Sequence, residues 1–196
     1  MSKKSLKGSS LVGSTPSRGR VEDDFYATPL SATKAIFERE PMDGLIWEPA
    51  CGDGAISKFL IEQGKTVISS DLVDRGYGIA PIDFLTIDPT EKEFNHDVII
   101  TNPPFSLAQQ FIEKALSFDN TKVIMFCKIQ LLEGKARKEM FLNSPLKCVY
   151  VFSERQNPLR NGQEYDENGK KWSSTMCFAW FVWDKTHRGK PTIEWI

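Results

Sequence analysis

A chain of 196 residues, 40% of them hydrophobic, is long enough for one domain with a substantial core. Its net charge of −1 argues against binding to nucleic acid by overall charge, and no apolar run is long enough to cross a bilayer. The two histidines and four widely spaced cysteines, without a Cys-x-x-Cys pair, disfavour a zinc site. These totals predict a reduced cytoplasmic protein without a metal ion or a membrane anchor.

The charge is divided unevenly along the chain. Residues 1–20 carry five Lys or Arg side chains and no acid, so the remainder is acidic. A stretch rich in Ser, Gly and Lys buries too little apolar surface to fold by itself. We therefore expect residues 1–21 to be a disordered basic tail, which either touches phosphates or aids solubility. Residues 22–196 are expected to form a single domain.

Helix and strand patterns alternate along that domain. Thr28-Pro29 is typical of a helix start, and glycines or prolines punctuate the later apolar runs. Strands are expected at 44–48, 65–72, 97–101, 121–128, 147–152, 175–183 and 191–196. Helices are expected from 28 onward and at 55–64, 106–118 and 134–144. This order predicts a parallel-rich α/β sandwich whose last two strands form an antiparallel C-terminal hairpin.

The strand at 97–101 ends in the sequence Asn-Pro-Pro-Phe, residues 102–105. Its β-branched residues are typical of a strand buried on both faces in the middle of a parallel sheet. The prolines end it, because neither has an N–H and both fix φ. A polar side chain, a rigid turn and an aromatic ring thus stand at the carboxyl end of a central strand, where open α/β sheets bind ligands.

Residues 48–54, Glu-Pro-Ala-Cys-Gly-Asp-Gly, form a glycine turn between a strand and a helix. The glycines allow close approach of a ligand, but the spacing is not that of the dinucleotide fingerprint, and Glu48 and Asp53 would repel phosphate. A cationic or hydroxyl-rich ligand fits better. Asp71 follows Gly52 by 19 residues, near the ~20-residue offset at which a carboxylate meets ribose hydroxyls. Alternatively, the turn is only a tight strand–helix connection.

Together and in this order, the segments "WEPACGDG", "SSDL", "IDFL" and "TNPPF" resemble the amino-group DNA methyltransferases, in particular small phage-type N6-adenine enzymes. The resemblance covers about residues 22–196 and includes "DDFYATP" upstream. It implies a Rossmann-like class I methyltransferase sandwich that uses S-adenosylmethionine and acts on duplex DNA in a bacterial or phage-infected cytoplasm. That cofactor carries a ribose and a sulfonium cation and no phosphate, which suits the acidic glycine turn.

The resemblance also implies a role for each motif. The Tyr-x-Thr-Pro element would close over the methionine end of the cofactor, and the glycine turn would pass beneath it. Asp71 would bind the ribose, Asp83 the adenine amine and Phe84 the adenine ring, although Phe84 is alternatively an ordinary core residue. The expected cofactor residues are Tyr26, Thr28, Pro29, Glu48, Ala50, Gly52, Asp53, Gly54, Asp71, Asp83 and Phe84.

The expected catalytic residues are Asn102, Pro103, Pro104 and Phe105. The Asn102 side-chain oxygen and the Pro103 carbonyl would accept the N–H bonds of adenine N6, and Phe105 would stack on the flipped base. Alternatively, the turn is only a rigid loop with a packed phenylalanine. Methylation of cytosine C5 is disfavoured because no Pro-Cys pair is present. Cytosine N4 is harder to exclude, although the family tends to place Ser where Asn102 stands.

Residues 154–172 are the expected target-recognition loop, because the 48 positions from Gly54 to Asn102 leave no room for a separate domain. Its basic side chains would contact phosphates or guanine edges, unless the loop is ordinary solvated surface. These side chains are Arg155, Arg160, Lys170 and Lys171. Two rival functions stay open: methylation of RNA or of a protein glutamine amide, and a non-catalytic binding protein with this fold.

Overall fold

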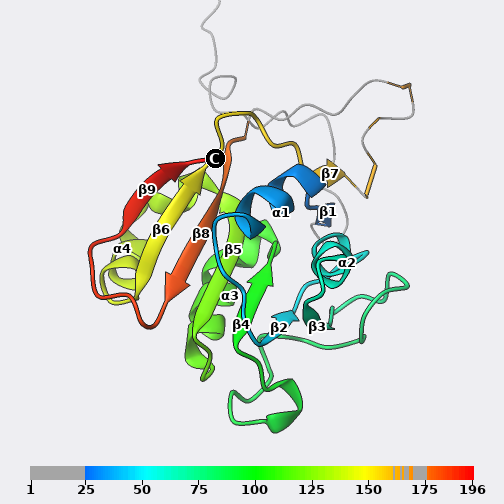
Figure 1. Ribbon diagram of the computed structural model, residues 1–196, viewed down its shortest axis with the longest axis horizontal. Helices are drawn as coiled ribbons and strands as arrows, with labels where there is room; N and C mark the ends of the chain where they lie inside the picture. The colour runs from blue at the N-terminus through cyan, green and yellow to red at the C-terminus, as the bar shows by residue number, and fades with distance from the viewer. Residues whose placement is uncertain (1–24, 161, 164, 166–167, 170–175) are drawn as a thin grey trace, which may run out of the picture.

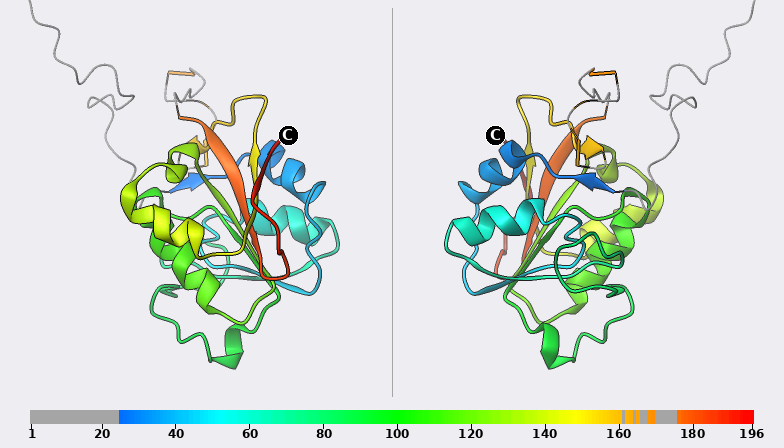
Figure 2. Two further views of the ribbon diagram at one scale, coloured as in Figure 1. Left: turned by 90° about the vertical axis from the view of Figure 1, so that its left-hand side faces the viewer. Right: turned by 90° about the vertical axis from the view of Figure 1, so that its right-hand side faces the viewer.

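The computed structural model describes residues 25–160, 162–163, 165, 168–169 and 176–196. The expected basic tail at 1–21 and the candidate DNA contacts Lys170 and Lys171 lie outside these ranges. Within them the chain forms a seven-stranded sheet covered by helices on both faces, with a two-stranded sheet at its side (Figures 1 and 2). No helix in the described ranges is long and apolar enough to span a membrane.

The large sheet has the strand order β3-β2-β4-β5-β8-β6-β9. Its first four strands are parallel, and β8 runs antiparallel to both of its neighbours. The strands are β2 (Leu45–Glu48), β3 (Thr66–Ser69), β4 (Val98–Thr101), β5 (Lys122–Lys128), β6 (Leu146–Val151), β8 (Phe178–Asp184) and β9 (Thr192–Trp195). The expected parallel-rich α/β sandwich is confirmed, and the predicted strands all occur within a few residues of their expected ends.

Two helices cover each face of the sheet (Figure 2). They are α1 (Leu30–Phe37) and α2 (Ala55–Glu62) on one face, and α3 (Ala108–Ser117) and α4 (Lys135–Leu142) on the other. Strand β4 shows why both faces are apolar: Val98 and Ile100 pack toward α1 and α2, whereas Ile99 packs toward α3. A strand between two helical layers therefore needs a continuous apolar run, as the sequence has.

The expected C-terminal hairpin is wrong. Strands β8 and β9 do not pair with each other, because β6 lies between them and bonds to both, antiparallel to β8 and parallel to β9. The burial of the strands explains the arrangement. Six of the seven residues of β8 are buried, so it takes a central position, whereas all four residues of β9 are exposed and it takes the edge.

The short strand β1 (Tyr26–Ala27) pairs antiparallel with β7 (Leu159–Arg160). Pro29 follows β1 and caps α1 with φ −58°, so the helix starts where Thr28-Pro29 predicts. The connection from β3 to β4 holds only the short 3₁₀ turn η3 (Lys92–Phe94), as its weak pattern indicates. Two further 3₁₀ turns, η4 (Phe105–Leu107) and η5 (Ile129–Leu132), follow β4 and β5.

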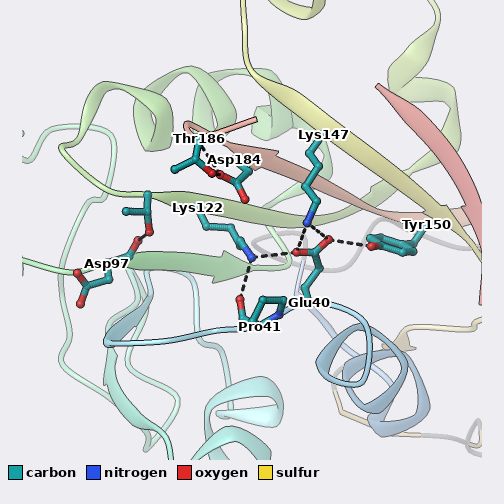
Figure 3. Close-up of polar contacts among 9 residues, drawn as sticks. Glu40, Pro41, Asp97, Lys122, Lys147, Tyr150, Asp184 and Thr186 are labelled. Atoms are coloured by element: carbon teal, nitrogen blue, oxygen red, sulfur yellow. Dashed lines mark hydrogen bonds and ion pairs between the residues drawn. The ribbon is translucent and has the colours of Figure 1, made fainter. Parts of the chain in front are cut away.

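A buried ionic cluster holds the segment between α1 and β2 against the sheet (Figure 3). Glu40 accepts hydrogen bonds from Lys122 Nζ at 2.9 Å, Lys147 Nζ at 2.9 Å and Tyr150 Oη at 2.8 Å. Burial acts to raise the pKa of Glu40, but these three donors outweigh it, so the pKa lies below its ordinary value. The cluster thus connects the N-terminal helix to β5 and β6 through one ionised carboxylate.

Candidate active site

A cavity of about 380 Å³ opens at the carboxyl ends of β2 and β4. It brings together segments that are far apart in the sequence: β1, the glycine turn, the end of β3, residues 82–85 and the Asn-Pro-Pro-Phe turn. Of the residues expected to bind a cofactor, all but Pro29 and Gly54 line it; these two cap α1 and α2 beside it. Asn102 and Pro104 also line the cavity.

The glycine turn has the backbone that its sequence predicts. Gly52 and Gly54 adopt φ values of 57° and 82°, in the left-handed region that favours glycine. A Cβ on Gly52 would overlap the ring of Phe25, which packs directly against the turn. The backbone N–H of Gly52 donates to Asp71 Oδ2 at 2.8 Å. Asp71 therefore lies beneath the turn, at the end of β3, as its spacing from Gly52 indicates.

Asp71 is held by more than the glycine turn. Its Oδ1 accepts hydrogen bonds from the Val73 N–H at 2.9 Å and from Arg75 Nη1 at 3.1 Å. The Arg75 guanidinium in turn lies over the ring of Phe25, 4.6 Å from its centroid. Sequence reasoning gave no role to Phe25 or Arg75, because only the folded chain brings them to Asp71.

The glycine turn is acidic and protected from solvent. Burial raises the pKa of Glu48 to about 8; hydrogen bonds from Ser57 oppose the shift, and the nearby charges of Asp53 and Asp71 add to it. Burial likewise raises the pKa of the Cys51 thiol to about 12, together with the charges of Glu48 and Asp71. The thiol is therefore protonated near neutral pH and is unsuited to act as a nucleophile.

Two side-chain oxygens in this cavity lack a partner. Asp53 Oδ1 and Asn102 Oδ1 are buried, and neither has a hydrogen-bond partner within the described ranges. The Asn102 amide is fixed from its other end, because Nδ2 donates to the Tyr26 carbonyl at 2.7 Å. Buried polar atoms are almost always paired in folded proteins, so an unpaired acceptor in a cavity points to a ligand donor.

Aromatic rings surround the Asn-Pro-Pro-Phe turn. The ring of Phe105 stacks on Tyr26, with centroids 5.2 Å apart and an interplanar angle of 24°. Lys128 Nζ lies 4.3 Å from the Phe105 centroid, and Phe178 packs at 5.5 Å. Lys128 was not expected from the sequence; its only signal was a polar residue at the carboxyl end of β5. Phe105 is thus covered by neighbours from three separate segments.

Residues 83 and 84 serve different purposes. Asp83 Oδ1 accepts the Leu85 N–H at 3.0 Å and lines the cavity. Phe84 also lines it, but its ring is 2% exposed and packs against Trp47 and Phe111 in the core. The alternative interpretation of Phe84 as a core aromatic therefore describes most of its surface, while its remaining edge faces the cavity.

The expected recognition loop adjoins the cavity through β7. Tyr26 pairs with Arg160 and Ala27 with Leu159, so this loop lies beside the Tyr-x-Thr-Pro element. Arg155 is exposed. For Arg160 only the backbone is described. The structure thus brings the start of the loop to the site and leaves its two lysines outside the described ranges.

No protein-family profile and no curated protein sequence matches this chain. Solved structures do. A protein assigned as an RNA methyltransferase from Pyrococcus horikoshii has a TM-score of 0.58 at 16% identity, over 86% of this chain and 91% of that one. A modification subunit assigned to a type I restriction enzyme of Vibrio vulnificus YJ016 has a TM-score of 0.57 at 14% identity. This chain has a Rossmann-like methyltransferase fold.

The matches differ in how much of the known structure they cover. The alignment with the Vibrio subunit spans 88% of this chain but only 47% of that subunit. A dimethyladenosine transferase from Plasmodium falciparum has a TM-score of 0.51 at 13% identity, over 82% of this chain and 62% of that one. At such identities the likeness establishes the fold, and the chemistry has to be argued from the site.

Proposed function

We propose that this chain is a DNA methyltransferase that uses S-adenosylmethionine to methylate the N6 amine of adenine. The observation that carries the proposal is the buried Asn102 Oδ1, which has no hydrogen-bond partner among the described residues. Leaving a buried acceptor unpaired is costly, unless a ligand supplies the donor. This acceptor lines the same cavity as the acidic glycine turn, so one cavity offers places for an amine and for a cation.

S-adenosylmethionine suits the chemistry of the cavity. Its ribose hydroxyls fit Asp71, and its positive charges fit Asp53, whose buried Oδ1 lacks a partner in the described part of the chain. Its adenine would meet Asp83 and Phe84. The remaining contacts would come from Thr28, Pro29, Glu48, Ala50, Gly52 and Gly54. When bound, the cofactor supplies an electrophilic methyl group.

Asn102 would act by positioning the target amine. Its Oδ1 and the Pro103 carbonyl accept the two N–H bonds of adenine N6, whose lone pair is otherwise delocalised into the ring. The lone pair then points into the cavity. The two oxygens would stabilise the positive charge that N6 gains as its bond to the methyl carbon forms and the methyl–sulfur bond breaks, the electron pair of that bond going to sulfur to leave a neutral thioether; a proton would then leave N6 for solvent. Pro103 and Pro104 keep the turn rigid.

DNA as the substrate is supported by the aromatic and basic surroundings of the turn. Phe105 would stack on a flipped base, which must leave the duplex to reach Asn102. The loop that pairs with β1 through β7 carries the proposed backbone and base-edge contacts. These are Arg155, Arg160, Lys170 and Lys171. The Vibrio subunit of similar fold is assigned to a restriction enzyme.

Nucleoside mass spectrometry tests the proposal. The protein is incubated with isotope-labelled S-adenosylmethionine and, in parallel, with unmethylated duplex DNA, RNA and total protein. Labelled N6-methyladenine in the DNA is the expected result, and Asn102→Ala should abolish it while cofactor binding persists in calorimetry. Labelled N4-methylcytosine would overturn the choice of base. Label only in RNA or in glutamine would overturn the choice of substrate, and no label would favour a binding protein.

A further inference from the structure

Two consecutive aromatic side chains, Phe25 and Tyr26, lie on different parts of the site. In extended backbone, successive side chains point to opposite sides. Phe25 packs against Gly52 of the glycine turn and under the guanidinium of Arg75, which is itself bonded to Asp71 at 3.1 Å. Phe25 therefore belongs to the part of the cavity where the cofactor is proposed to bind.

Tyr26 faces the Asn-Pro-Pro-Phe turn instead. Its ring stacks on Phe105, and its carbonyl accepts the Asn102 amide at 2.7 Å. The motif resemblance assigned Tyr26 to the cofactor together with Thr28, and Tyr26 does line the cavity. Its two specific contacts, however, are with the residues proposed to bind the target base.

Resting on the proposed function, we infer that Tyr26 is a positioning residue for the target base: it forms the wall of the base site opposite Phe105. A separation of 5.2 Å between the ring centroids leaves no space for a base between them. A base that stacks on this face of Phe105 must therefore move the Tyr26 ring outward. The displaced ring then lies against the other face of the base.

The choice of face follows from the neighbours of Phe105. Its other contacts are the Lys128 ammonium at 4.3 Å and Phe178 at 5.5 Å, both from the β5 and β8 side. The Tyr26 side is the one where Asn102 is held, because the Asn102 amide binds the Tyr26 carbonyl. A base stacked there brings its exocyclic amine to the unpaired Oδ1.

The backbone of β1 supports such a movement of the side chain alone. Tyr26 pairs with Arg160 of β7, and its carbonyl is held by Asn102, so the main chain is fixed while the ring is only partly buried. Ring rotation about the side-chain torsions can open the stack without breaking either backbone contact. In this structure the Tyr26 ring stacks on one face of Phe105.

The test compares Tyr26→Leu with Tyr26→Phe, and uses Phe25→Leu as the matched change in the neighbouring residue. Leucine fills much of the space of an aromatic ring but has no face for stacking. The methylated motif is first mapped by sequencing DNA treated with the wild-type protein. A duplex of that motif with 2-aminopurine at the target position then reports stacking by fluorescence.

We expect Tyr26→Leu to lower kcat/KM for DNA at least tenfold and to brighten the flipped 2-aminopurine, because one stacking partner is lost. Its Kd for S-adenosylmethionine should stay within twofold of wild type, and Tyr26→Phe should restore activity and quenching. Phe25→Leu should show the opposite pattern, with at least a tenfold weaker Kd for the cofactor.

Two results overturn the inference alone: Tyr26→Leu weakens cofactor binding as Phe25→Leu does, or it leaves kcat/KM for DNA unchanged. A wild-type protein that binds the cofactor but methylates no DNA overturns the proposed function, and the inference with it. The two failures are thus distinct. Circular dichroism and thermal unfolding show whether Tyr26→Leu folds. If it does not, the inference is tested by the other two variants: Tyr26→Phe should keep wild-type activity and quenching, and Phe25→Leu should weaken cofactor binding.

Discussion

The Asn102 side chain shows what an amide provides that a carboxylate does not. Its nitrogen donates to the Tyr26 carbonyl, which leaves its oxygen to face the cavity without a partner among the described residues. The sequence predicted that the Asn102 oxygen accepts a hydrogen bond from the target amine. It did not predict that the Asn102 nitrogen donates to the carbonyl of Tyr26, 76 positions away. The orientation of the amide is thus fixed by a contact between β1 and the turn after β4.

Replacing Asn102 by Asp tests this orientation. A carboxylate has no N–H for the Tyr26 carbonyl, so two oxygens would face each other and the side chain would turn away or take up a proton. We expect methyl transfer to fall about 100-fold or more, in the range seen when one positioned transition-state contact is lost. Cofactor affinity measured by calorimetry should change little. Asn102→Asp with wild-type kcat would contradict the assigned hydrogen bond.

Glu48 gives the protein a pH dependence in stability. The folded pKa is raised to about 8 by burial, whereas an unfolded Glu titrates near 4.5. Between these values the folded state keeps a proton that the unfolded state has lost, so the free energy of unfolding falls as pH rises and levels off above about 8. At one pKa unit per about 1.4 kcal/mol, the upper limit of the loss is ~5 kcal/mol.

Glu48→Gln should remove this slope. Urea unfolding of both proteins at intervals from pH 5 to pH 9 measures it. The difference between the two curves isolates Glu48 from His96, whose pKa is lowered by burial and which therefore costs stability only as pH falls below its ordinary value. Parallel curves for the two proteins would mean that Glu48 is ionised throughout this range.

At the scale of elements, local pattern predicted what each segment would be, and not which segment it would touch. The continuous apolar run of β4 and the apolar stripe of α2 could be predicted from the sequence, because the spacing of their apolar residues matches the residues that are buried in the structure. The pairing of β6 between β8 and β9 did not, since strand order depends on long-range competition for the central positions. The same limit hid Phe25 and Lys128, which join the site only by packing against Gly52 and Phe105.

The glycine turn offers a controlled test of that packing. Gly52 and Gly64 both adopt positive φ, 57° and 78°, but a Cβ on Gly52 would overlap Phe25, whereas nothing described lies within 4 Å of one on Gly64. Alanine at either position costs about 1 kcal/mol of backbone strain. Only Gly52→Ala should also weaken cofactor binding, tenfold or more in calorimetry. Equal cofactor affinity in the two variants would mean that the contact between Phe25 and Gly52 does not contribute to the cofactor site.

At the scale of the whole molecule, the Glu40 cluster connects parts of the chain that are more than 100 positions apart (Figure 3). Lys122 of β5 and Lys147 of β6 share its carboxylate. Because the folded pKa of Glu40 is depressed, the stability that it contributes is present above pH 4.5 and is lost as pH falls through the folded pKa.

Removing the charge of Glu40 should therefore destabilise the protein strongly. Glu40→Gln leaves two lysines without a counter-charge, and breaking a buried pair costs roughly 3–5 kcal/mol. The pair of Lys65 and Asp43, 3.7 Å apart with Asp43 88% exposed, provides the control. Asp43→Asn should cost less than about 1 kcal/mol in the same urea titration. Similar losses of unfolding free energy in both variants would show that the buried cluster contributes no more to stability than the exposed ion pair.

The connection from β6 to β8 contains the proposed recognition loop, and its two ends bear on how much its length can vary. The loop leaves β6 and returns to β8, and these strands are direct neighbours with Val151 opposite Ala179. A loop anchored at two paired positions can grow with little penalty, since each doubling of its length costs only about 0.6 kcal/mol. Residues can therefore be added to or removed from this segment at small cost in stability, while the paired ends in β6 and β8 stay in place.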